Sequence, residues 1–158
     1  MNPDATTRRV HECRPLSWPV DWRTFPRWKR FLWGVSVVGS NRQVWRTLLE
    51  QARLRTPECL SLWQVYTIEE RELADRISSV ICHSLQWPNP FFVPRDPFEI
   101  LVWDYTGDLK TGETLCAIEK SLGLLRLSDE QWDDLLKCCL GDVVKVLVAG
   151  QHSRSDLK

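Results

Sequence analysis

The stretch that decides the fold reads DYTGDLKTGETLCAIEKSLGLLRL over residues 104–127, and SDEQ follows at residues 128–131. Asp108 is a good N-cap residue, and the apolar positions after it recur at helical spacing up to Gly123. Glycine commonly ends helices because it adopts the left-handed conformation without strain. We therefore predict a helix from Asp108 to Gly123. Its inner face is expected to carry Leu115, Ile118 and Leu122.

Two capping boxes mark further helix starts on either side of this stretch. Thr67–Glu70 reads TIEE and Ser128–Gln131 reads SDEQ, so each Ser or Thr is followed three residues later by Glu or Gln. The first helix is expected to stop at Trp87, before a proline, and a last short helix is expected from Gly141 to Gly150. The apolar face of the first helix comprises Leu73, Ile77, Val80, Ile81 and Leu85.

A long loop with four prolines separates the first of these helices from the one at Asp108. It carries several large apolar residues, which we expect to pack on the core. Upstream, Asn41 is predicted to cap a helix that ends before Pro57, and residues 25–39 fit either a short helix or an extended strand. The apolar loop residues are Phe91, Phe92, Val93 and Phe98.

The order of a long helix, a long loop, a middle helix, a short helix and a last helix, over about residues 66–150, resembles the acyl carrier protein family. The segments that carry the resemblance are ETLCAIEKSLGL from Glu113, LSDEQWDDLL, and LGDVVKVL from Leu140. The resemblance implies an all-α fold with a carrier-like four-helix bundle. We divide the chain into a basic, Trp-rich helical extension (residues 1–57), the bundle (58–150) and a tail (151–158).

The residue that carries the cofactor in that family is absent here. An Asp-Ser-Leu triplet opens the family's middle helix, and its serine holds phosphopantetheine. This chain has Gly107-Asp108-Leu109 instead, so Asp108 stands either at the serine position or beside a deleted serine. Thr106 and Thr111 offer hydroxyls, but both have simpler roles as turn or cap groups. The resemblance therefore implies a module without a prosthetic group.

The function that the resemblance implies is non-catalytic binding of a partner protein in bacterial lipid or secondary metabolism. We predict that a partner with a basic groove binds an acidic helix face formed by Asp108, Glu113 and Glu119. Asp108 is equally well explained as an N-cap, worth about 1 kcal/mol without any further function. One alternative is a genuine acyl or peptidyl carrier with a different attachment register, and another is a membrane-surface adaptor.

The adaptor alternative rests on the uneven charge of the chain, whose formal net charge is zero. Residues 1–57 contain eleven Lys and Arg against four Asp and Glu, and the remainder is correspondingly acidic. Basic and aromatic residues together can contact a membrane surface, cover a second core or dock on the acidic half. We expect no nucleic-acid partner, since the acidic half would repel phosphates. The candidate basic aromatic surface comprises Trp22, Arg27, Trp28, Lys29 and Arg30.

Cysteine usage and the remaining motifs suggest neither a metal centre nor an enzyme. The six cysteines include no CxxC pair and no histidine at ligand spacing, so we predict reduced thiols, no metal and a cytoplasmic protein. The longest apolar run, residues 31–39, is too short to span a bilayer, and the N-terminus has no apolar signal segment. Without a phosphate loop or a nucleophile elbow, we expect no catalysis and no cofactor.

Overall fold

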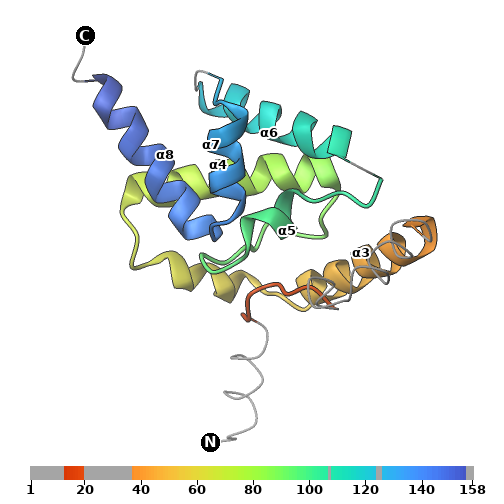
Figure 1. Ribbon diagram of the computed structural model, residues 1–158. Helices are drawn as coiled ribbons and strands as arrows, with labels where there is room; N and C mark the ends of the chain where they lie inside the picture. The colour runs from red at the N-terminus through yellow and green to blue at the C-terminus, as the bar shows by residue number, and fades with distance from the viewer. Residues whose placement is uncertain (1–12, 20–36, 107, 124–125, 156–158) are drawn as a thin grey trace, which may run out of the picture.

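The computed structural model describes residues 13–19, 37–106, 108–123 and 126–155 (Figure 1). Most of these residues are helical and none forms a β-strand, which confirms the predicted all-α class. An isolated bridge pairs Pro97 with Cys139. The elements are α3 (Val37–Arg53), the 3₁₀ helix η2 (Pro57–Trp63), α4 (Ile68–Leu85), α5 (Phe98–Val102), α6 (Asp108–Leu122), α7 (Asp129–Leu136) and α8 (Leu140–Ser155).

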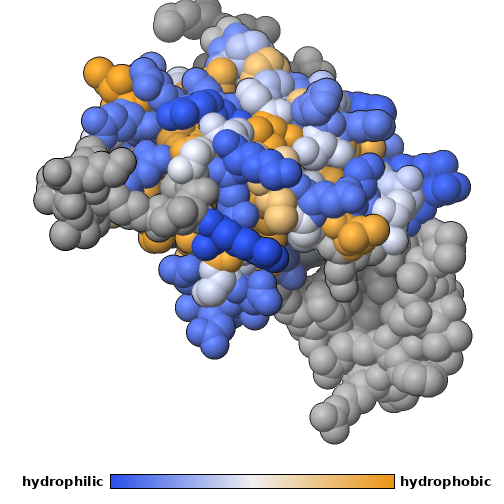
Figure 2. Space-filling view, turned by 90° about the horizontal axis from the view of Figure 1, so that it is seen from above, coloured by the Kyte–Doolittle hydropathy of each residue, from blue (hydrophilic) through white to orange (hydrophobic). Residues whose placement is uncertain are grey.

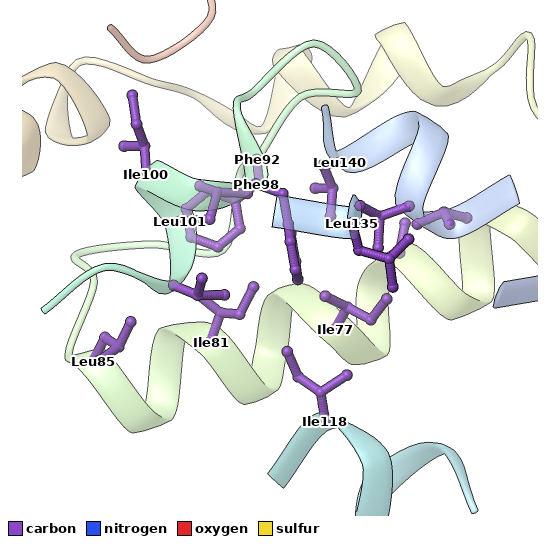
Figure 3. Close-up of a cluster of buried hydrophobic side chains, with 14 of the residues drawn as sticks. Ile77, Ile81, Leu85, Phe92, Phe98, Ile100, Leu101, Ile118, Leu135 and Leu140 are labelled. Carbon is purple, nitrogen blue, oxygen red and sulfur yellow. The ribbon is translucent and has the colours of Figure 1, made fainter. Parts of the chain in front are cut away.

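Helix α4 lies at the centre and packs against both α6 and α8 (Figure 1). Four of the five residues of its predicted apolar stripe are buried, with Ile77 and Ile81 fully inaccessible, while Val80 is half-buried. Ile118 of α6 approaches from one side, while Phe98 and Leu140 pack from the other (Figure 3). Each such side chain contributes about 1.5–3 kcal/mol through burial, so these contacts on two sides of α4 form the main apolar core.

The two capping boxes and the glycine stop after α6 are confirmed, whereas α4 ends at Leu85 with a left-handed Gln86 rather than at Trp87. The Thr67 side chain accepts from the Glu70 N–H at 3.2 Å, and the Glu70 carboxylate accepts from the Thr67 N–H at 2.8 Å. Ser128 and Gln131 form the same reciprocal pair at the start of α7. Gly123 follows α6 with a φ of 62°, the left-handed conformation expected at that position.

The proline-rich loop packs on the core, also as predicted. Phe92 and Val93 are buried, and the Phe92 carbonyl accepts from Trp63 Nε1 at 2.9 Å. Trp87 Nε1 donates to the Leu101 carbonyl at 3.1 Å, so the indole N–H is satisfied although its ring is buried. The loop is therefore held by backbone acceptors as well as by apolar contacts.

The start of α8 is fitted closely against this loop. The Leu140 N–H donates to the Asp96 carbonyl and the Gly141 N–H donates to the Pro94 carbonyl, each at 2.8 Å. A Cβ on residue 141 would collide with the Tyr66 hydroxyl and would lie 3.1 Å from the Pro94 carbonyl oxygen. Glycine is thus required at position 141 for close approach of two backbones.

Several predictions about the first half of the chain and the last helix are wrong. Asn41 is not an N-cap, because α3 begins at Val37. Neither η2 nor α5 was predicted, and α8 continues through Gly150 to Ser155. An interior glycine costs a helix only about 1 kcal/mol relative to alanine, so Gly150 does not end it. The expectation for residues 25–39 falls largely outside the described residues.

The prediction that all cysteines are reduced is also wrong, because Cys13 and Cys59 form a disulfide. Their Cα atoms lie 5.2 Å apart across a separation of 46 residues, so no local sequence signal pairs them. The thiols of Cys82, Cys116, Cys138 and Cys139 are free. Among the described helices, none combines the length and the apolar character needed to cross a membrane.

Candidate functional site

The outer face of α6 is an exposed surface with an apolar centre. Leu109 is 80% exposed, and the face forms a shallow hollow of about 800 Å³. These residues lie opposite the buried stripe of the same helix, so they carry no part of the core. Figure 2 looks down on the side of the molecule that bears α6 and shows apolar surface among hydrophilic residues. The α6 outer face comprises Leu109, Gly112, Glu113, Cys116, Ala117 and Lys120.

Glu119 does not belong to this face, which corrects its predicted place. Its side chain is only 7% exposed and accepts hydrogen bonds from Trp132 Nε1 at 3.0 Å and from the Leu127 N–H at 2.7 Å. The carboxylate thus joins α6 to the connection that leads into α7. Glu119 follows Leu115 by four residues, so helical periodicity alone would have placed it on the inner side.

The start of α6 is supported by a buried carboxylate upstream. Asp104 is buried and accepts from both the N–H and the hydroxyl of Thr106. Asp108 is the first residue of α6, and its side chain lies outside the described residues. Of the predicted acidic face, Glu113 is therefore the carboxylate that the structure places on the α6 outer face.

The predicted basic aromatic surface also lies outside the described residues. This holds for all five of its members, Trp22, Arg27, Trp28, Lys29 and Arg30. Their contact with a membrane or with the acidic half stays a prediction. Further along the same half, Trp45 is buried and packs edge-on against Trp87 at 4.9 Å between ring centroids.

A second notable feature is the buried ion pair between Arg55 and Asp96, which we call the Arg55–Asp96 hub. Both side chains are almost fully inaccessible, and two guanidinium nitrogens contact the two carboxylate oxygens at 2.5 and 2.6 Å. Asp96 also accepts from the Leu16 N–H at 2.8 Å and from the Val93 N–H at 2.7 Å. The guanidinium donates further to the carbonyls of Phe91 and Arg14. A buried pair is tolerable when its remaining donors and acceptors are satisfied in this way.

The hub holds residues 13–19, which we call the strap, against the rest of the protein. The Cys13–Cys59 disulfide fixes one end of the strap, and Leu16 is buried. Gln51 exchanges two hydrogen bonds with the backbone of Ser17, at 3.0 and 3.1 Å. Trp18 packs edge-on against Trp103 with ring centroids 5.2 Å apart. The strap is therefore tied covalently, electrostatically and by packing.

The thiols of Cys82 and Cys139 are poorly suited to nucleophilic chemistry at neutral pH. Burial raises the pKa of the Cys82 thiol, which donates to the Trp87 carbonyl at 3.2 Å. Burial, and then the hydrogen bond to the Asp142 carboxylate, raise the pKa of the Cys139 thiol. A raised pKa lowers the fraction of reactive thiolate. In the part of the chain described here, no group of three or more His, Cys, Asp or Glu residues is placed to hold a metal ion.

The comparisons with known proteins return nothing that bears on this arrangement: no family model, no curated protein and no solved structure matches the chain.

The hub was missed at the sequence level, since Arg55 and Asp96 are 41 residues apart. The one available signal was an aspartate within an apolar, proline-rich loop, where an ionised side chain requires a partner.

Proposed function

We propose that the protein is a non-catalytic, carrier-like interaction module whose α6 outer face binds a partner protein. The observation that carries the proposal is the exposure of Leu109 beside Glu113 on a helix whose opposite face is buried. Exposed apolar side chains rimmed by charge are typical of protein interaction sites. The partner that fits this surface presents an apolar groove with basic residues at its edge.

The finer fold proposal is an acyl carrier-like bundle made of α4, α6, α7 and α8. Three points support it: the order of the helices, the long loop between α4 and α6, and the packing of α4 against both α6 and α8. In such a bundle α6 corresponds to the helix that opens at the family's attachment serine. The α6 outer face would then occupy the place where carriers meet their partners.

We further propose that the module carries no phosphopantetheine. No serine lies near the start of α6, and the hydroxyl of the nearby Thr106 is bonded to the buried Asp104 carboxylate. A hydroxyl held in this way serves the turn before the helix. Incubation with coenzyme A and a broad-specificity phosphopantetheinyl transferase should leave the intact mass unchanged. A gain of one phosphopantetheine group would favour the genuine carrier instead.

Partner binding is tested by using the full chain as bait in three forms: unchanged, Glu113→Lys, and Glu72→Lys. Glu72 is an exposed glutamate on α4, so its reversal is a matched control for the change of charge. We expect a specific partner to be lost with Glu113→Lys and retained with Glu72→Lys. Reversing a basic residue at the partner's groove should restore binding to the Glu113→Lys form. Equal capture of the partner by all three forms would exclude the α6 outer face as its binding site.

A further inference from the structure

A second concave surface lies between the strap and η2, on elements other than α6. The hollow has a volume of about 900 Å³, and the strap, η2 and the proline-rich loop all contribute to its walls. We call it the strap groove. Its apolar lining comprises Pro15, Leu62, Val65, Val93 and Pro94.

Two large apolar side chains of the lining, Leu62 and Val65, are exposed. Val65 is 89% exposed and Leu62 is 45% exposed, whereas Val93 at the base is buried. Val65 lies in the turn that follows η2, outside the apolar stripes of the helices. When a ligand covers such side chains, the removal of apolar surface from water stabilises the complex, and the core is not disturbed.

Two cations complete the lining. Arg14 lies on the strap and Arg95 on the loop, and both residues line the strap groove and are exposed. Neither guanidinium has a hydrogen-bond or ion-pair partner within the described ranges. Glu58 also lines the groove, so its titratable charges are two positive and one negative. This balance complements a ligand with a single negative charge better than one with two.

The wall that carries Arg14 is fixed before any ligand binds. Cys13, the adjacent residue, is joined to Cys59 of η2, and the Arg14 carbonyl accepts from the buried Arg55 at 2.9 Å. A site whose backbone is already ordered loses less conformational entropy on binding. The strap groove is therefore a preorganised surface.

From this combination we propose that the strap groove binds a single-chain amphiphile with a carboxylate head. The carboxylate would pair with Arg14 and Arg95, for which guanidinium geometry is well matched, and the apolar chain would cover Leu62 and Val65. The volume of about 900 Å³ lies within the range of about 300–1,000 Å³ that small-molecule sites occupy. Its two arginines distinguish the strap groove from the α6 outer face, which has none. This site is independent of the α6 outer face.

The test is a methyl NMR titration of the full chain with decanoate, kept below its critical micelle concentration. Saturable shifts are expected at the methyl groups of Leu62, Val65 and Val93. Decyltrimethylammonium has the same chain with a cationic head and should bind at least fivefold more weakly. N-acetyl-leucine combines a carboxylate with a compact apolar side chain. If it bound more tightly than decanoate, the proposal that the ligand has a long apolar chain would be overturned.

Substitutions of lining residues test whether decanoate binds in the strap groove. Arg95→Gln and Val65→Ser should each raise the Kd for decanoate at least fivefold. Their matched controls, Arg76→Gln on α4 and Val146→Ser on α8, replace exposed residues outside the groove and should change it less than twofold. Binding that is unaltered by Arg95→Gln, or that is equal for the cationic amphiphile, would overturn the proposal. Glu113→Lys should have no effect, so this test is separate from that of partner binding.

Discussion

The Arg55–Asp96 hub and the α6 outer face differ in how completely their groups are matched. At the hub, the carboxylate of Asp96 receives hydrogen bonds from Arg55, Leu16 and Val93, all within a buried site. On the α6 outer face, Leu109 is largely exposed and packs on nothing in the core. The difference indicates that the hub maintains the structure, while the α6 outer face is available for a partner.

The same comparison explains why three distant segments form one unit. The α3–η2 connection supplies Arg55 and the proline-rich loop supplies Asp96, and the strap is hydrogen-bonded to both members of this ion pair. Loss of one partner would leave the other charged and buried, which costs far more than an exposed pair is worth. Variants at the hub should therefore lower the free energy of unfolding far more than variants on the α6 outer face.

The largest effect is expected from Asp96→Ala. It leaves the Arg55 guanidinium buried without its carboxylate and removes the acceptor of two backbone N–H groups. The free energy of unfolding should fall by about 4 kcal/mol, in the range for breaking a buried pair. Chemical denaturation followed by circular dichroism measures it. Asp75→Ala, at an exposed position of α4, is the control and should cost under about 0.5 kcal/mol. Similar values for the two variants would contradict a role for the hub in stability.

Removing the disulfide should have the next largest effect. The double variant Cys13→Ser/Cys59→Ser frees a loop closed over a separation of 46 residues, so the unfolded state gains entropy. The expected loss is about 3 kcal/mol, measured under non-reducing conditions. Cys116→Ser changes an exposed free thiol and should be neutral. If the double variant were as stable as Cys116→Ser, the covalent tie of the strap would be unimportant.

Gly141→Ala should have an intermediate effect. Its new methyl group would collide with the Tyr66 hydroxyl and crowd the Pro94 carbonyl, which cannot move without the loop. We expect a loss of about 2 kcal/mol from overpacking. Gly150→Ala meets nothing within 4 Å in the same helix and should stabilise the protein by about 0.5–1 kcal/mol. In thermal unfolding, the melting temperature should fall for Gly141→Ala and rise for Gly150→Ala. Shifts in the same direction would contradict a specific need for glycine at position 141.

The smallest effects on stability are expected on the α6 outer face. Leu109→Ser and Glu113→Lys alter exposed side chains, so each should change the free energy of unfolding by less than about 0.5 kcal/mol. Both should nevertheless abolish capture of the partner. A large loss of stability in either variant would mean that this face is part of the core contacts.

Helices α4, α6 and α7 were predictable because their signals are local. The capping boxes at Thr67 and Ser128 and the left-handed Gly123 each depend on residues within one turn. Periodicity also identified the buried stripe of α4. The all-α class followed from these segments alone.

The features that depend on distant residues were not predictable in the same way. Nothing near Cys13 indicates Cys59, and nothing near Arg55 indicates Asp96. Glu113 is exposed, whereas Glu119 is buried, so its placement on the acidic face was wrong: its charge was given more weight than its position on the inner side. Periodicity would have corrected this error, but only the three-dimensional structure reveals the strap groove.

The most direct test of the hub is a double-mutant cycle of Arg55→Leu and Asp96→Leu, measured by chemical denaturation. Each single variant leaves an unpaired buried group, whereas the double variant removes both charges. We predict that the double variant loses less stability than the two single losses combined, with a coupling of at least about 2 kcal/mol. Additive losses would show that the two side chains act independently, and would contradict the view that one ion pair holds the strap, the α3–η2 connection and the proline-rich loop together.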